Sequence, residues 1–384
     1  MQNNAIKSGS ARGEKTHIRE LGINLDRWYA IARSTEVQTQ PVAAKIWNRA
    51  IVLFRDSAGK INALEDRCPH RQVKLSHGKV KGDLIECAYH GWRLNASGEC
   101  AEVDYLAENQ KLPNCKIRSY PVKEQNGFIW LFPGDETQAE KTHLLDVPEW
   151  EHLNYIATVS VIDCQAHYSF LIENLMDMYH GHLHDDWQAW ANPVLDTLEE
   201  NEHQVTARYQ AQSYYKIDKI WSISQLFFKS LRRLHPEPLE VSYVYPHWVS
   251  TLGSDFKIYC LVCPVSETAT RAYLIHFTSL NAFWRLHKLP VWFRRFIKNR
   301  CFGAAQKLLD GLVRQDVLMI EEEQQAFLHN SERKSYELNR ALASVQKLMR
   351  SQAENRLELH KSFIDTETAN IRQIDTDTTQ IISR

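Results

Sequence analysis

The sequence predicts an α+β protein of two domains, a small antiparallel β domain followed by a larger domain of strands and long helices. Its 384 residues are enough to build two hydrophobic cores. From about residue 25 to residue 135, short strand-like runs alternate with Gly, Asn and Pro. Farther along, longer strand-like segments precede an apolar pattern of helical spacing. Runs of strands followed by helices are typical of the α+β class.

The first domain is expected over residues 25–135, after a polar leader at 1–24 that we expect to be mobile. A Ser57-Ala58-Gly59 turn separates two of its strands, and Pro133-Gly134 follows a third. The clearest strands are Ala50–Arg55, Ile61–Leu64 and Phe128–Phe132.

The second domain is expected over residues 161–335, after a linker at 136–160. It opens with a helical stretch around His167–His184 and closes with a long helix from about Ala304 to Leu328. The strands between them are Gln204–Ser213, Val241–Tyr245, Phe256–Pro264 and Thr270–Thr278. Residues 336–384 are expected to be helical at first and then disordered, because the end of the chain lacks a sustained apolar face.

Composition excludes several classes of function. A formal charge of −1 gives no reason to expect a nucleic-acid partner. Eight scattered cysteines do not form a disulfide framework, and a reducing, cytoplasmic compartment is expected. The polar N-terminus does not read as a signal peptide, and no apolar run is long enough for a transmembrane helix.

The most specific motif consists of Cys68-Pro69-His70 and Cys87-Ala88-Tyr89-His90. Two thiolates on one iron and two imidazoles on the other hold a Rieske [2Fe–2S] cluster, which is a one-electron relay. Zinc is the competing reading, because a Cys2His2 set can also bind it. Structural zinc sites usually pair Cys with Cys and His with His, whereas each arm here mixes the two, which favours the cluster.

Residues 68–92, CPHRQVKLSHGKVKGDLIECAYHGW, resemble the cluster signature of Rieske non-haem iron oxygenases. Trp28 and the run IVLFRDSAGKINALEDR before the first arm resemble the N-terminal domain of that family. Rieske proteins of respiratory complexes carry an extra cysteine pair that neither arm has. The resemblance implies an antiparallel β Rieske domain and a helix-grip catalytic domain.

A second metal site is suggested by ENLMDMYHGHLH at residues 173–184. If this stretch is helical, His180 and His184 share one face, with Asp177 on the same side. Two such histidines can begin a two-histidine, one-carboxylate triad for Fe(II), although a polar surface turn is the plain alternative. The segment resembles the iron motif of the family, with Glu173, Asn174, Asp177, His180 and His184 on matching positions. His182 could replace His184 if the helix breaks at Gly181.

The resemblance places the third iron ligand at Asp316, in LVRQDVLMIEEEQ, which is similar to a late-helix segment of the family. Asp310 and Glu321–Glu323 are the rival carboxylates, and a charge run of the latter kind is usually a solvated helix face. The resemblance also gives Asp177 a catalytic role as a bridge between a cluster histidine of one protomer and an iron histidine of the next, in a ring of three chains. A carboxylate that accepts from two imidazole N–H groups would connect them and fix both rings.

The function expected from this resemblance is hydroxylation, dihydroxylation or oxidative demethylation of a hydrophobic or aromatic compound with O2. Electrons would come from NAD(P)H through a separate reductase or ferredoxin, because the chain has no Gly-rich dinucleotide fingerprint. The alternative is a Rieske electron carrier, or a ligand-binding protein whose second domain is inactive.

Two aromatic and basic stretches, residues 220–235 and 283–299, have two readings. They can be amphipathic core segments, or they can form a pocket rim or a contact with a membrane surface for a lipophilic substrate. Cys260 and Cys263 have no second cysteine pair nearby in the sequence, so a metal-binding role is not expected of them.

Overall fold

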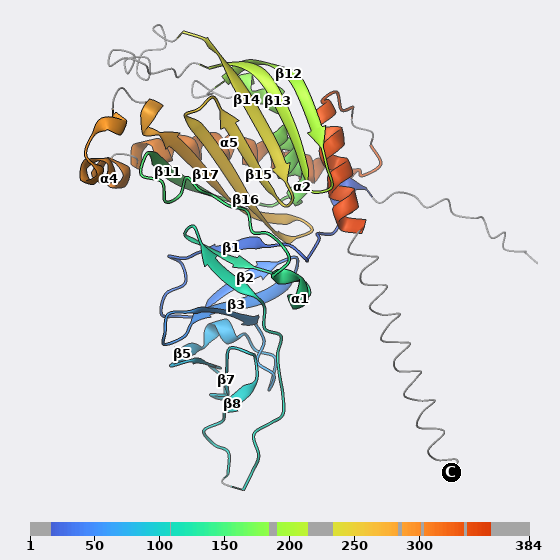
Figure 1. Ribbon diagram of the computed structural model, residues 1–384. Helices are drawn as coiled ribbons and strands as arrows, with labels where there is room; N and C mark the ends of the chain where they lie inside the picture. The colour runs from blue at the N-terminus through green and yellow to red at the C-terminus, as the bar shows by residue number, and fades with distance from the viewer. Residues whose placement is uncertain are drawn as a thin grey trace, which may run out of the picture.

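A computed structural model describes residues 17–107, 109–183, 190–213, 233–282, 286–300, 303–333 and 336–354. Figure 1 shows a smaller β domain, drawn in blue to teal, beneath a larger domain built on one broad sheet. The predicted fold class is confirmed: antiparallel sheets make up the first domain, and a larger antiparallel sheet with few helices makes up the second.

The small domain consists of three antiparallel sheets, with strand orders β1-β10-β9, β2-β3-β4 and β5-β6-β7-β8. Its tight hairpins use residues with positive φ: Trp47 and Asn48 join β2 to β3, and Asn126 and Gly127 join β9 to β10. The strands are β1 (Tyr29–Arg33), β2 (Val42–Ile46), β3 (Arg49–Arg55), β4 (Ile61–Glu65), β5 (Lys79–Lys81), β6 (Leu84–Glu86), β7 (Arg93–Leu94), β8 (Cys100–Glu102), β9 (Val122–Gln125) and β10 (Phe128–Leu131).

The large domain is organised on a seven-stranded antiparallel sheet in the order β11-β17-β16-β15-β14-β13-β12. β11 already begins inside the stretch 136–160 that the sequence assigns to a linker. The domain boundaries drawn from the sequence therefore stay a prediction. The strands are β11 (Tyr155–Cys164), β12 (Trp190–Glu200), β13 (Gln204–Ser213), β14 (His235–Val244), β15 (His247–Leu252), β16 (Phe256–Ser266) and β17 (Ala269–Ser279).

The two faces of this sheet have different neighbours. One face packs on the small domain, where Tyr259, Tyr273 and Phe277 join Trp28 and Trp130 in an aromatic cluster. The opposite face is covered by helices α2 and α5, and by a C-terminal helix at residues 340–354 (Figure 1). The α-helices with labels in Figure 1 are α1 (Glu136–Ala139), α2 (Tyr168–Met176), α4 (Val291–Arg300) and α5 (Gly303–His329).

The sequence suggested one helical stretch around His167–His184, but the structure shows that this stretch is not one continuous helix. Helix α2 ends at Met176, and Asp177 has extended backbone angles of φ −88° and ψ 98°. The Asp177 carboxylate accepts from the backbone N–H of Tyr179, a local bond that competes with helix propagation. A 3₁₀ segment, η3 (Met178–Leu183), then follows and carries His180. The long closing helix, by contrast, forms as α5 where the apolar pattern predicts it.

A buried histidine ties the two domains together. The ring Nδ1 of His247 accepts from the backbone N–H of Val262 at 3.1 Å, so its Nε2–H donates to the carbonyl of Trp28, also at 3.1 Å. Burial is the main reason that the pKa of His247 falls from 6.5 to about 4. The imidazole is therefore neutral at pH 7, in the tautomer that both contacts require.

We expect acid to loosen this junction. The unfolded chain takes up a proton on His247 near pH 6.5, whereas the folded chain resists protonation down to about pH 4. The contribution of the neutral ring is thus complete above pH 6.5 and is lost as pH falls towards 4, by about 3 kcal/mol. The free energy of unfolding, measured between pH 7.5 and pH 5, should fall less steeply in His247→Gln than in the parent chain. Equal slopes would contradict this assignment.

Candidate iron-binding sites

The two cysteine-histidine arms lie on neighbouring loops at the end of the small domain that is farthest from α5 (Figure 1). The first arm follows β4, and its turn is closed by bonds from Cys68 N–H to Val73 and from Gln72 N–H to Cys68. The second follows β6, where Cys87 N–H donates to the carbonyl of Trp92 at 2.8 Å. Short strands thus fix the ends of both loops, and backbone bonds fix their tips.

The four predicted cluster side chains converge. The Cys68 and Cys87 thiols are 1% and 2% exposed and lie in hydrogen-bonding contact, and the rings of His70 and His90 have centroids 4.6 Å apart. Nδ1 of His70 is enclosed and has no hydrogen-bond partner among the described residues. A buried nitrogen without a partner is costly unless it binds something, so it suits a metal ligand.

The electrostatics of these side chains also fit an iron-sulfur cluster. Burial, as the largest cause, raises the pKa of the Cys68 thiol to about 11, so its thiolate forms only beside a strong cation such as ferric iron. Burial and the neighbouring His90 lower the pKa of His70, which keeps that ring neutral and able to ligate. The donor set therefore fits two irons that each take two protein ligands.

The thiols and the imidazoles differ in their access to solvent. Both cysteines are buried, whereas His70 and His90 are partly exposed. Trp92 stacks on His70 with centroids 4.7 Å apart and planes 4° apart, and Tyr89, which is 60% exposed, covers His90. The histidine edge is therefore the side of the site from which an electron can leave.

A second group of candidate ligands lies between η3 and α5. His180 Nε2 is 3.6 Å from Asp316 Oδ1, and Asn174 Nδ2 donates to the same oxygen at 3.3 Å. Two of the three predicted iron ligands, 136 positions apart in the sequence, thus meet in the fold. His184 lies outside the described residues, as does the side chain of His182. Among the described residues, no three side chains of metal-ligating type come within reach of a single metal ion, either here or at the two cysteine-histidine arms.

The rival carboxylates are engaged elsewhere. Asp310 accepts from the Ser160 hydroxyl at 2.6 Å, and Glu321 accepts from the backbone N–H of Gln165 at 2.8 Å. The first contact holds α5 against the middle of β11, and the second holds it against the residue that follows this strand. Glu322 and Glu323 are exposed. Asp316 is the carboxylate of this helix that contacts His180.

The charges around His180 favour a cation. Burial alone would lower the pKa of His180, but contacts with Asp177 and Asp316 outweigh it and raise the pKa to about 9. Without a metal, the two carboxylates therefore hold a proton on this ring at pH 7. A divalent iron could take the place of that proton, so the local charge fits the proposed occupant.

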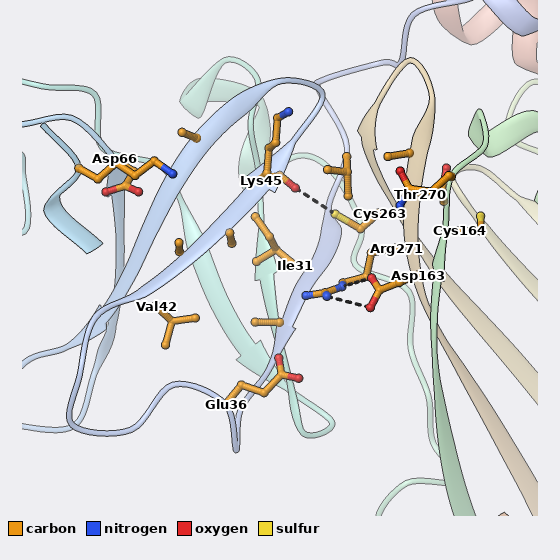
Figure 2. A pocket seen from close by; sticks show the side chains of 18 residues that line it. Ile31, Glu36, Val42, Lys45, Asp66, Asp163, Cys164, Cys263, Thr270 and Arg271 are labelled. Atoms are coloured by element: carbon orange, nitrogen blue, oxygen red, sulfur yellow. Dashed lines mark hydrogen bonds and ion pairs between the residues drawn. The ribbon is translucent and has the colours of Figure 1, made fainter. Parts of the chain in front are cut away.

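Two hollows among the described residues are lined by neither His180, Asp177 nor Asp316. One, of about 360 Å³, lies between β1–β3 of the small domain and the ends of β11, β16 and β17, where Arg271 pairs with Asp163 at 2.6 and 2.9 Å (Figure 2). The other, of about 400 Å³, lies between β11 and α5. Because neither His180 nor Asp316 lines either of them, we assign neither to the reaction.

Comparison with known proteins identifies the chain. Residues 27–121 match the model of the Rieske [2Fe-2S] domain. Over 349 residues, 87% of this chain and 89% of its relative, it is 31% identical to 4beta-methylsterol monooxygenase of Methylococcus capsulatus (strain Bath). The chain belongs to the Rieske non-haem iron oxygenases.

Two further comparisons agree with this family: a relative that matches less of the chain, and a solved structure of lower sequence identity. The iron-sulfur subunit of the toluene-4-sulfonate monooxygenase system of Comamonas testosteroni is 34% identical over 173 residues, 44% of this chain and 46% of that subunit. The crystal structure of dicamba monooxygenase with 3,6-dichlorosalicylic acid superposes with a TM-score of 0.69 at 18% identity, covering 88% of this chain and 99% of that one. The latter likeness supports the fold alone.

Membership of the Rieske oxygenases settles several expectations. The cluster is a Rieske [2Fe–2S] centre rather than zinc, a mononuclear iron accompanies it, and the chain is an oxygenase that uses O2 and externally supplied electrons. The alternatives of an electron carrier and of an inactive binding protein are set aside. The individual ligands stay predictions that the geometry above supports.

Sequence reasoning missed one residue at the second site. Asn339, which is 6% exposed, donates its side-chain amide to Asp177 Oδ1 at 3.0 Å. An Asn before a helical run is a helix-start signal that the sequence does contain. Its contact with Asp177 spans 162 positions, and no local pattern could reveal it.

Proposed function

We propose that this Rieske oxygenase oxidises a polycyclic, sterol-like compound, with oxidative demethylation or hydroxylation at a ring carbon as the reaction. The observation that carries the proposal is the 31% identity with 4beta-methylsterol monooxygenase, which extends over both domains. Relatives named for smaller aromatic substrates, such as the toluene-4-sulfonate and vanillate enzymes, align over less than half of this chain. The substrate is chosen largely by the second domain, so the longer alignment is the more informative one.

In this proposal the chain holds its two centres with separate side chains. Cys68, His70, Cys87 and His90 hold the cluster, and His180, His184 and Asp316 hold the mononuclear iron. When bound, the two centres supply stored electrons and activation of O2. Asn174 holds the Asp316 carboxylate by donating to Oδ1, and the Trp92 ring restricts the orientation of His70 by stacking on it.

Asp177 is proposed to connect the two centres across a subunit boundary. Its Oδ2 lies 3.9 Å from Nδ1 of His180, close enough for a small adjustment to form a direct bond. Within one chain, β5 and β7, which flank the cluster loops, lie well apart from α5, with β1–β3 of the small domain and the broad sheet between them (Figure 1). An electron would therefore come from the cluster of a neighbouring chain, and a homotrimer is the assembly that the family suggests.

The proposed partners are a ferredoxin or an NAD(P)H-dependent reductase, which would deliver electrons to the cluster. The proposed compartment is the cytoplasm, since thiolate ligands and free cysteines persist in reducing surroundings.

Peripheral contact with a membrane is proposed for α4, because a sterol-like substrate is stored in lipid. Trp292 and Phe296, four positions apart on this helix, are 70% and 53% exposed. Residues 283–300 contain six Lys or Arg and no acidic residue. Exposed aromatic rings beside cations suit the interface of an anionic bilayer. No described helix is both long and apolar enough to cross a membrane. The other predicted stretch, 220–235, lies almost wholly outside the described residues.

A vesicle assay checks this contact. The protein should sediment with vesicles that contain anionic phospholipid, and Trp292→Ala/Phe296→Ala should reduce the bound fraction severalfold without changing the melting temperature. Vesicles of zwitterionic lipid alone are the control. Equal sedimentation of the parent and the double variant would remove α4 from the proposal.

The substrate proposal is tested with labelled oxygen. The purified protein, with a reductase system and NADH, is incubated under ¹⁸O2 with 4-methylsterols and, in parallel, with methoxylated or sulfonated aromatic acids. Incorporation of label into a sterol product supports the proposal. Turnover of only the aromatic acids would agree with an oxygenase but would contradict the proposal of a sterol-like substrate.

A further inference from the structure

The C-terminal helix at residues 340–354 returns to the second iron site. Figure 1 shows it, in orange-red, standing beside the end of the sheet near α2. Its apolar face is buried through Ala341, Leu342, Val345, Leu348 and Met349, which belong to the same core as α2. A helix with five such residues buried has a fixed position on the domain.

Polar contacts fix the position of this helix further. Gln346 donates to Glu173 of α2 at 2.9 Å, and Glu173 is also paired with Arg19. Ser344 donates to Glu200 of β12 at 2.6 Å. The helix is thus joined both to the helix that precedes the iron motif and to an edge strand of the sheet.

Asn339 begins this helix and performs two tasks with one side chain. Its Oδ1 accepts from the backbone N–H of Ala341 at 3.0 Å, which is a helix N-cap. Its Nδ2 donates to Oδ1 of Asp177 at 3.0 Å. The amide therefore transfers the fixed position of the C-terminal helix to the Asp177 carboxylate.

This contact determines which way the Asp177 carboxylate faces. Oδ1 accepts from two donors, Asn339 Nδ2 and the backbone N–H of Tyr179 at 3.1 Å. With Oδ1 held by two fixed donors, rotation of the carboxylate is restricted. Oδ2 is left directed at His180 Nδ1, 3.9 Å away.

We propose that Asn339 is a positioning residue for electron transfer, which holds the Asp177 carboxylate so that Oδ2 faces the iron-ligand histidine. This inference rests on the proposed role of Asp177. It adds that the path between the centres depends on a residue outside both metal motifs, supplied by the C-terminal segment.

The test uses Asn339→Ser in the full-length, metal-loaded protein. Serine is a good N-cap and keeps the start of the helix, but its short side chain cannot reach Asp177. Ser344→Ala is the matched control, since it removes a contact of the same helix that does not involve Asp177. The measurements are the rate at which the reduced cluster is reoxidised in a single turnover, kcat, KM and the melting temperature.

We expect reoxidation and kcat to fall about tenfold in Asn339→Ser, with KM and melting temperature close to those of Ser344→Ala. A crystal structure of the iron-free variant should show the Asp177 carboxylate rotated or in two orientations. Wild-type reoxidation in Asn339→Ser, or equal losses in both variants together with a lower melting temperature, would overturn the proposal.

Asp177→Asn distinguishes a failure of the role proposed for Asn339 from a failure of the bridge proposed for Asp177. If it abolishes reoxidation while Asn339→Ser does not affect it, only the role of Asn339 fails. If neither variant affects reoxidation, the bridge proposed for Asp177 fails as well.

Discussion

Replacing Asp177 with Asn is expected to lower kcat roughly 100-fold while both metal centres stay bound. Asparagine has nearly the shape of aspartate and can still accept from Tyr179 and Asn339 through its one oxygen. It then directs an N–H₂ group at the N–H of His180, so two donors face each other. The charge-assisted connection between imidazoles is lost, although no proposed iron ligand has changed.

Three measurements on Asp177→Asn test this prediction. Iron content and the electron paramagnetic resonance signal of the reduced cluster should match those of the parent, whereas reoxidation of that cluster by O2 and substrate should nearly stop. Loss of iron would instead make Asp177 a ligand. Unchanged turnover would exclude it from the electron path.

The subunit boundary has its own test. Chains with Cys68→Ser are expected to lack the cluster and chains with Asp316→Ala to lack the mononuclear iron, so neither should be active alone. Oligomers assembled from a mixture of the two should regain activity if electrons cross between chains. No recovery in mixtures shown to contain both chains would contradict a path between subunits.

The second large effect is expected from Asp316→Ala. Iron should fall from about three to about two atoms per chain, with the visible spectrum of the cluster retained and no detectable turnover. The physical reason is that Fe(II) would lose its proposed carboxylate ligand and one of the two negative charges near His180.

Glu322→Ala is the matched control for Asp316, because it removes an exposed carboxylate from the same helix, less than two turns away. This variant should keep three irons and full activity. If Asp316→Ala also kept three irons, the third ligand would have to be sought among the other carboxylates or in the residues around His184.

The fold was predictable where local pattern determines structure. Strand β13 has the bounds that the sequence suggests, and α5 differs by one residue at each end, since both are long elements with clear periodicity. The break after α2 was not predictable, because it depends on how the Asp177 side chain bonds to its own backbone. The partners of each strand also depend on the whole sheet and not on any one segment.

The candidate site was predictable to the extent that its chemistry lies in short motifs. Cys68 and His70 are two positions apart, and their residue types alone specify the kind of centre. Asp316 needed the resemblance to a family, since several carboxylates share its helix. Asn339 needed the structure itself, because its partner is distant in sequence and its residue type is common at helix starts.

The buried His247 has a consequence for how the enzyme works. Its ring donates one hydrogen bond from β15 to the carbonyl of Trp28 beside β1 and accepts a second from Val262 of β16, and the aromatic cluster between the domains surrounds the same junction. A joint of this kind opposes any swing of the Rieske domain towards the iron of its own chain. In the proposed ring, we therefore expect the gap that an electron crosses to be fixed when the chains assemble.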